Sequence, residues 1–335
     1  SQVSEEQLPR IAAYLETTPI SIGASDSGFI FDIQTTVRAG ERTAFVQIAG
    51  SHTNVIRVEK DGAVLLRRDF AEGSQGERTD RALLTVERIV EFADCVEIED
   101  VRPTLDRQIA FNTAIAEEGL RGDWGANIGR VLLNAYGDDV ANRAKAMAAA
   151  GSDGRMSGCE LPVVINSGSG NQGLTASLPV IVYAEELKVS RERLYRALVV
   201  SNLVTIHLKT GIGRLSAYCG ATSAGCGAGA GITYLYGGKA YEISHTIVNA
   251  VAINSGMVCD GAKASCAAKI ASAVEAGLLG MQMQRQGAQF YGGDGIVRKG
   301  VENTIYNVGR LARYGMAATD KEIIDMMIAE QPQGC

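Results

Sequence analysis

The sequence predicts an α+β protein, in which a small α/β domain with an antiparallel sheet precedes a mainly all-α domain. Up to about residue 100, apolar and polar residues alternate with a period near two, which is typical of half-buried strands. From Arg107 onward, apolar residues recur at the 3.6-residue period of helices. The chain has 39 glycines but only 6% aromatic residues, which favours closely packed helices. We expect the boundary near Asp100–Pro103, with domains at 1–102 and 103–335.

The first domain is expected to hold a sheet flanked by two helices. Asp61-Gly62 separates two of its alternating segments, and this dipeptide favours a tight antiparallel hairpin. A second turn is expected at Ala39–Glu41. The expected strands are 29–37, 43–49, 53–58 and 63–67, and the expected helices are 7–15 and 81–93.

The second domain is expected to be a bundle of helices. Ser190 precedes one of them in the manner of an N-cap residue, with an acidic residue in the first turn. The expected helices are 109–118, 124–136, 138–150, 174–186, 190–209, 215–236, 240–254, 266–283, 294–312 and 319–328.

Composition excludes several classes of protein. The 335 residues carry a formal net charge of −6, and an acidic chain without a basic stripe is a poor nucleic-acid binder. No segment reaches the roughly 18 uninterrupted apolar residues of a membrane span, and Leu215–Tyr236 is interpreted as a buried helix of a soluble protein. The first residues form a polar stretch and the seven cysteines are an odd number, so we expect a cytoplasmic protein with reduced or metal-bound thiols.

Two cysteines stand out by their surroundings. Cys219 opens a run rich in Gly and Ala, and Cys259 lies beside an acid, a glycine and a lysine. Neither segment contains the CxxC pattern of zinc ribbons or thioredoxin-like proteins. Ligands contributed singly from distant helices suit an iron–sulfur cluster that keeps one iron open. Cys266 and Cys335 are further candidate ligands, whereas the remaining three fit small buried hydrophobic residues: Cys95, Cys159 and Cys226.

A glycine-rich segment is the candidate substrate-binding loop. It comes directly before a helix, whose free backbone N–H groups favour a carboxylate or phosphate. Its candidate binding residues are Asn166, Ser167, Gly168, Ser169, Gly170 and Asn171. The alternative is a plain helix cap. Arg155, just upstream, is a candidate bidentate clamp for a substrate carboxylate, or else a solvated arginine in a surface turn.

The chain has three histidines, and each is a candidate acid or base: His52, His207 and His245. His52 lies between two hydroxyl residues at a strand end and is the best candidate, since the other two fit helix histidines with satisfied hydrogen bonds. Lys263 is a second candidate base, provided that its pKa is depressed by burial or a neighbouring cation. The residues do not decide between His52 and Lys263.

Four motifs together resemble the L-cysteine desulfidase family, which is related to the α chain of iron–sulfur L-serine dehydratases. They are Asn166-Ser-Gly-Ser-Gly-Asn-Gln-Gly173, Ser51-His-Thr-Asn54, Arg214-Leu-Ser-Ala-Tyr-Cys219 and Gly256-Met-Val-Cys-Asp-Gly-Ala262. The resemblance covers essentially the whole chain. It implies a [4Fe–4S] cluster held by three cysteines, of which the second and third correspond to Cys219 and Cys259, since 259 − 219 = 40 matches their spacing. It also implies a mainly helical catalytic domain beside a small α/β domain like that of serine dehydratase β chains.

The implied activity is β-elimination from L-cysteine to hydrogen sulfide, ammonia and pyruvate. The family's first cluster cysteine belongs to an N-terminal Gly-Cys-Thr-Glu-Pro segment, and this motif does not occur here. We therefore expect that segment to be a missing part, a separate chain or a cleaved piece, and the chain alone to be inactive if the cluster stays incomplete. Further expected partners are the amino-acid substrate and other copies in a homo-oligomer. The alternatives are an L-serine dehydratase and, in another class, a non-catalytic amino-acid-binding protein.

Overall fold

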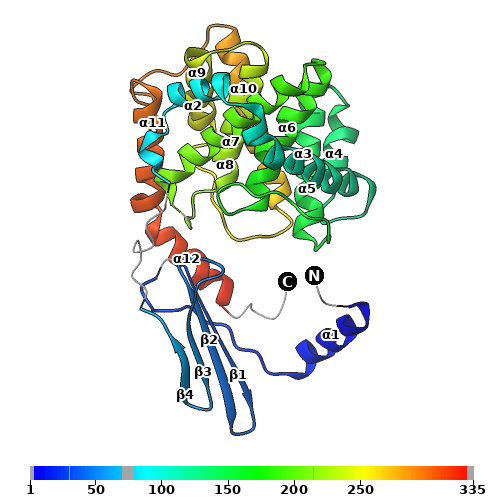
Figure 1. Ribbon diagram of the computed structural model, residues 1–335, viewed down its shortest axis with the longest axis vertical. Helices are drawn as coiled ribbons and strands as arrows, with labels where there is room; N and C mark the ends of the chain where they lie inside the picture. Colours follow the sequence, from blue (N-terminus) through cyan, green and yellow to red (C-terminus); the bar gives the residue numbers. More distant parts are fainter. Residues whose placement is uncertain (1–3, 30, 70–78, 214, 330–335) are drawn as a thin grey trace. The chain divides into compact units, whose positions relative to one another are not determined.

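The structure is a computed structural model that describes residues 4–29, 31–69, 79–213 and 215–329. The chain divides into two compact units, each with its own contacts. One unit comprises residues 1–80 and 320–335, and the other runs from Arg81 to Thr319. The predicted α+β class is confirmed, because the sheet strands of the described residues lie between 32 and 67 and helices make up most of the remainder (Figure 1).

The first unit contains a four-stranded antiparallel sheet in the order β1-β2-β3-β4, and each strand pairs with its neighbour in sequence. Asp61 and Gly62 both have positive φ, at 49° and 81°, as a two-residue hairpin turn requires. Register shifts interrupt the pairing of β3 with both of its neighbours. The elements are α1 (Leu8–Thr17), β1 (Asp32–Ala39), β2 (Arg42–Ala49), β3 (Val55–Lys60) and β4 (Ala63–Arg67).

The second unit is a helical bundle built around α8, in which every residue from Ala221 to Leu235 is buried (Figure 1). Its helices are α2 (Val86–Cys95), α3 (Ile98–Arg121), α4 (Ile128–Tyr136), α5 (Val140–Met156), α6 (Gly170–Glu186), α7 (Arg191–Ile212), α8 (Gly220–Leu235), α9 (Ala240–Ile253), α10 (Cys266–Arg285) and α11 (Val301–Arg310). A π-helical turn, Leu311–Gly315, leads into α12 (Ala317–Ile328), which contributes residues to both units.

The division into units differs from the predicted domains at 1–102 and 103–335. Pro103, expected at the boundary, lies inside α3. Both α2 and α3 pack on α7, so the segment 81–102 belongs to the helical unit. None of the helices that the structure describes is both long and apolar enough to span a membrane.

Glycines set the distance and direction between the central helices. A Cβ at Gly225 would lie 2.1 Å from the Ala273 carbonyl oxygen, and one at Gly229 would lie 2.7 Å from the Gly277 carbonyl oxygen. Residue numbers therefore rise together along α8 and α10, and the two helices run parallel. Gly220 likewise faces Gln172, and Gly231 faces Val180, so α6 is also parallel to α8.

Candidate metal and substrate site

The backbone brings Cys219 and Cys259 together. Tyr218 and Val258 form an isolated antiparallel bridge, closed by hydrogen bonds from Cys219 N–H to the Met257 oxygen (3.2 Å) and from Cys259 N–H to the Ala217 oxygen (2.7 Å). Neighbouring side chains along extended backbone point to opposite faces. Both cysteines directly follow the paired residues, so their side chains share one face and their thiols hydrogen-bond to each other.

This contact makes the two thiols unequal. The hydrogen bond from Cys219 lowers the pKa of Cys259, burial opposes this effect, and the Gly261 N–H, Lys269 and Lys209 add to it. The same hydrogen bond, together with burial, raises the pKa of Cys219. The pair therefore favours one thiol and one thiolate, and the thiolate is the form of cysteine that binds metal.

Three helix N-termini converge on the cysteine pair. Because α6, α8 and α10 are parallel neighbours, they begin at the same end of the bundle. Cys219 is the N-cap residue of α8 and Cys266 is the first residue of α10. A helix N-terminus carries unpaired backbone N–H groups and the positive end of the helix dipole, so this end of the bundle favours anions.

Three cationic side chains add to this positive potential. Lys269 donates to the Val258 oxygen at 3.0 Å and pairs with Asp260. Burial lowers the pKa of Lys269, but Asp260 and the two cysteine sulfurs outweigh burial and raise it. Lys209, at the end of α7, is only 7% exposed and lowers the pKa of Cys259 through its charge. Arg155 is the third, from the last turn of α5.

Arg155 meets the glycine-rich loop. α5 runs antiparallel to α6, because Gly151 faces Leu174 whereas Arg155 faces Gly170, where a Cβ would lie 2.3 Å from the Arg155 Nε. Its Nη1 donates to Asn171 Oδ1 at 3.3 Å. Among the described residues, no carboxylate forms an ion pair with this half-buried guanidinium. Arg155 thus lies half-buried in the last turn of α5 rather than in a surface turn, and its candidate role as a clamp for a substrate carboxylate stays a prediction.

The loop before α6 holds the Asn166 and Ser167 side chains in hydrogen bonds within the protein. Asn166 and Ser169 exchange backbone hydrogen bonds, while Ser167 and Gly168 adopt positive φ of 49° and 86°, which makes a tight turn. The Asn166 amide donates to Asn202, and the Ser167 hydroxyl donates to Asn166 Oδ1 at 2.8 Å. These side chains are thus occupied within the protein. The first-turn N–H groups of residues 170–172 are those that a helix leaves without internal acceptors.

Four buried polar atoms near Cys219 have no hydrogen-bond partner within the described parts of the chain: Gln172 Oε1, Tyr218 Oη, Thr222 Oγ1 and Ser223 Oγ. Thr222 and Ser223 lie in the first turn of α8, directly after Cys219 and Gly220. Thr233, further along α8, does donate to the Gly229 oxygen at 2.8 Å. Unpaired buried polar groups are rare in folded proteins and need an explanation such as a bound group.

The residues present fit part of an iron–sulfur centre. Two neighbouring cysteines offer sulfur ligands, of which Cys259 has the lowered pKa. The helix N-termini and lysines favour a negatively charged cluster, and the unpaired hydroxyls can donate to sulfur. Within residues 4–29, 31–69, 79–213 and 215–329, no three His, Cys, Asp or Glu side chains gather as a complete metal site. Cys266 donates to the Gly261 oxygen at 3.5 Å, and Cys335 lies outside the described residues. The described chain therefore contributes two neighbouring thiols.

The two candidate bases lie in different surroundings. His52 belongs to the first compact unit, where its ring lies 4.7 Å from that of Phe31. Lys263 lies in the second unit, and its Nζ pairs with Asp260 Oδ2 at 2.6 Å. Hydrogen bonds from Lys263 and Lys269 lower the pKa of Asp260 to about 2. The Lys263 ammonium group is thus engaged by a carboxylate of the same segment.

Sequence reasoning missed Lys209 and gave no separate role to Gln172. A signal for Lys209 exists in the sequence, because it falls on the apolar face of its helix beside Leu208 and Ile212. His207 pairs with Glu302 at 2.6 Å, as expected for a helix histidine with a satisfied hydrogen bond. The His245 ring lies edge-on to that of Tyr241, with 4.5 Å between the ring centroids.

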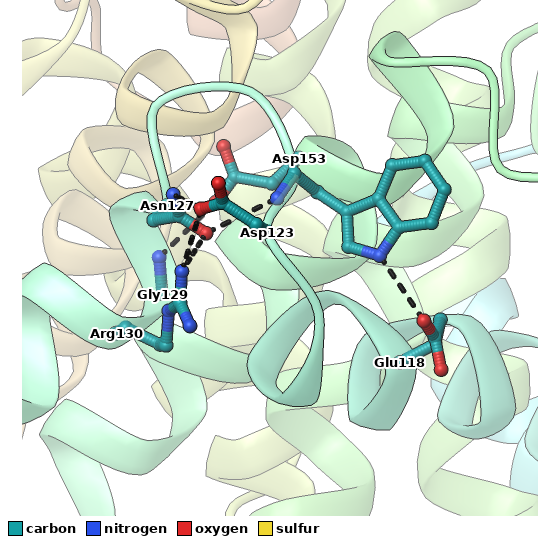
Figure 2. A network of polar contacts seen from close by, with 7 residues as sticks. Glu118, Asp123, Asn127, Gly129, Arg130 and Asp153 are labelled. Atoms are coloured by element: carbon teal, nitrogen blue, oxygen red, sulfur yellow. Dashed lines mark hydrogen bonds and ion pairs between the residues drawn. The ribbon is translucent and has the colours of Figure 1, made fainter.

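A buried carboxylate links the last part of α5, which also carries Arg155, to the start of α4. Asp153, two residues earlier on α5, is fully buried and accepts the Gly129 N–H at 3.2 Å, at the start of α4. Burial raises the pKa of Asp153, against backbone hydrogen bonds from the same segment. Figure 2 shows Asp153 near Asn127, the N-cap residue of α4, and near Arg130 in the first turn of this helix, where the Arg130 guanidinium donates to Asn127 Oδ1. The contact ties the last part of α5 to α4.

A separate cavity of about 810 Å³ lies in the helical unit, between the start of α9 and the segment leading into α11. His245 and Tyr241 line it, but none of the cysteines, Arg155 or the glycine-rich loop does. The cavity and the cysteine site are therefore distinct places in the fold.

Comparisons with known proteins give one matching family model and several relatives of high identity. The family model described as "Serine dehydratase alpha chain" matches residues 32–325. A UPF0597 protein of Desulfitobacterium hafniense is 59% identical over 98% of this chain and 76% of its own length. A UPF0597 protein of Lachnoclostridium phytofermentans is 53% identical over 87% of this chain and 70% of its own length, and one of Finegoldia magna is 43% identical over 98% and 78%. The chain belongs to the serine dehydratase alpha chain family.

Proposed function

We propose that this protein is an iron–sulfur-dependent lyase that releases hydrogen sulfide from L-cysteine by β-elimination. The observation that carries the proposal is the pair of thiols at three converging helix N-termini, beside an arginine without a carboxylate partner among the described residues. Membership of the serine dehydratase alpha chain family supports a lyase. The choice of cysteine over serine rests on the four motifs that resemble the desulfidase family.

Cys219 and Cys259 would hold the cluster, with Cys266, Cys335 or a cysteine of the family's N-terminal segment as candidate third ligands. When bound, a [4Fe–4S] cluster with an open iron supplies a Lewis acid for the leaving group. The low pKa of Cys259 favours the ligating thiolate at neutral pH. Such a cluster is sensitive to oxidation, so we propose the reducing cytoplasm as its compartment.

The substrate carboxylate would bind between Arg155, Asn171 and the first-turn N–H groups of α6. These groups fix the amino acid so that its side chain extends toward the cysteine pair. A base then removes the Cα proton, the Cα–Cβ double bond forms, and the Cβ–S bond breaks with both electrons leaving on sulfur. Protonation gives hydrogen sulfide, and the aminoacrylate that remains hydrolyses to pyruvate and ammonia. His52 and Lys263 remain the candidate bases.

The second candidate function is dehydration of L-serine at the same site, in which the Cβ–O bond breaks and water leaves. The family match favours this reaction as directly as the first, because the family is described by serine dehydratase. A non-catalytic amino-acid-binding protein is the candidate of another class. It would use the carboxylate site without a cluster.

The test is anaerobic reconstitution of the native protein with iron and sulfide, followed by assays of sulfide, pyruvate and ammonia with L-cysteine and L-serine. We expect a visible cluster absorbance and equal amounts of sulfide and pyruvate from L-cysteine. Cys259→Ala should abolish both absorbance and turnover. Cys226→Ala is the matched control, since Cys226 is 1% exposed within α8 and its pKa is raised to about 12 by burial, as for an inert core thiol. Pyruvate from L-serine alone would favour the dehydratase, and amino-acid binding without a cluster would refute the lyase.

A further inference from the structure

We infer that Gln172 recognises the α-ammonium group of the substrate and so restricts the site to α-amino acids. The inference rests on the proposed function and assigns a specificity-determining residue to it. Gln172 is 7% exposed, lies in the first turn of α6, and its Oε1 has no hydrogen-bond donor among the described residues.

The side chain of Gln172 does not accept the hydrogen bond that its position in the helix offers, which is the one from the Ser169 N–H. Ser169 is the N-cap residue of α6 and Gln172 is the third helical residue, the Ser-x-x-Gln spacing of a capping box. In that motif the glutamine accepts the N-cap N–H. Here the Ser169 N–H donates to the Asn166 oxygen at 3.0 Å instead, and no side-chain cap forms. Because the turn before the helix already uses the Ser169 N–H, the Gln172 amide can make another contact.

The neighbouring helix makes room for this amide. Gly220 directly follows Cys219 at the start of α8, and a Cβ there would lie 2.5 Å from Gln172 Nε2 and 2.7 Å from its Cδ. Any other residue at position 220 would push the amide away. The glycine thus permits the Gln172 amide to lie against the backbone beside the cysteine pair.

The position of the amide matches the geometry of an α-amino acid. Carboxylate and ammonium are attached to the same carbon, so their binding groups must be neighbours in the site. Gln172 adjoins Asn171, which contacts Arg155 at the proposed carboxylate site, and its amide reaches toward Cys219, where the substrate side chain would be activated. An ammonium group is a hydrogen-bond donor only, and it is matched by an unused acceptor such as Oε1.

The nearest acidic alternative is already engaged. Asp260 follows Cys259 in sequence, but both of its carboxylate oxygens pair with lysines, Lys263 and Lys269. Gln172 Oε1, by contrast, has no hydrogen-bond donor among the described residues and can accept from the ammonium group.

The experiment compares L-cysteine with 3-mercaptopropionate, which has the thiol and the carboxylate but lacks the ammonium group. Dissociation constants are measured in the anaerobically reconstituted native protein from the change in cluster absorbance on rapid mixing, before turnover. Gln172→Met removes the acceptor at similar size, Gly220→Ala displaces the amide without changing its chemistry, and Gln286→Met, at an exposed helix end, is the control.

We expect Gln172→Met and Gly220→Ala each to raise the dissociation constant of L-cysteine by about tenfold to a hundredfold. This is the usual range for the loss of a hydrogen bond to a charged group. In both variants, the dissociation constant of 3-mercaptopropionate and the cluster spectrum should stay unchanged. The Gln286→Met control should bind both ligands as the parent protein does. Equal effects on both ligands, or no effect on either, would overturn the assignment of Gln172. An unsubstituted protein that forms no cluster would instead overturn the proposed function, and this inference with it.

Discussion

Replacing Gly225 by alanine tests the close contact that aligns the N-termini of α8 and α10. A Cβ at this position would lie 2.1 Å from the Ala273 carbonyl oxygen and 3.0 Å from the Ala273 Cβ. The first neighbour is backbone, so no rotamer change can relieve the overlap. The two helices would have to separate, and α8 carries Cys219 at its start.

Two effects of opposite sign decide the outcome. Alanine is a better helix former than glycine by about 1 kcal/mol, which alone would stabilise the variant. Overpacking a well-packed core costs about 1–3 kcal/mol, and more where backbone must move. Because the overlap is with backbone, we expect an overpacking cost at the upper end of this range. Less the gain in helix propensity, the net loss in the free energy of unfolding is about 2 kcal/mol.

The assay is urea denaturation of the metal-free protein, with the midpoint and the slope measured separately. Gly256→Ala is the matched control, since a Cβ at Gly256 would meet no atom within 4 Å. It should leave the midpoint almost unchanged. If Gly225→Ala proved as stable as the parent or more stable, helix propensity would have outweighed the contact. The inferred close approach of α8 and α10 would then be wrong.

Four further substitutions test the site and the fold. In the reconstituted enzyme, Asn171→Ala should lower kcat/KM by about ten- to a hundredfold while the cluster absorbance persists, because one hydrogen bond to a charged group is worth roughly 1.5–3 kcal/mol; loss of the absorbance would contradict this role. In the metal-free protein, Thr222→Val should be neutral or stabilising, since its hydroxyl has no partner within the described chain, whereas Thr233→Val should cost about 1–3 kcal/mol by leaving its partner unpaired. The hydrogen bond from Tyr234 lowers the pKa of Asp94, so the ionised carboxylate stabilises the folded state. This stabilisation is complete above the unfolded-state pKa of about 4 and is lost as the pH falls through the lower folded-state pKa. Melting temperatures measured from pH 7 down to about pH 3 should therefore converge for the parent and Asp94→Asn, and parallel curves would refute the linkage.

The sheet was predictable because its signals are local. Period-two alternation locates strands wherever one face is buried, and Asp61-Gly62 specifies its hairpin through backbone conformations that these residues tolerate. The division into units was not predictable in the same way. Pro103 was expected at the domain boundary, yet it lies inside α3, which packs on α5, α6 and α7. Such tertiary contacts can outweigh local propensity.

The candidate site was predictable only in part. Cys219, Cys259 and the glycine-rich loop have unusual neighbours along the chain, and these neighbours alone are enough to single them out. The interpretation of Arg155 stayed open, because a solvated arginine and a clamp look identical in sequence. Its burial against Gly170 and its contact with Asn171 depend on the antiparallel packing of α5 on α6.

By itself, the sequence determined the α+β class, the hairpin and the cysteine motifs, since each depends on residues that are close together along the chain. Only the tertiary structure decided which helix ends meet, because glycines on different helices set that register through contacts far apart in sequence. It also separated occupied from unoccupied polar groups: Asn166 is bound to Asn202, whereas Gln172 is left with an acceptor that no described residue uses. Hydrogen-bond satisfaction is a property of the packed interior, and no local pattern of residues reveals it.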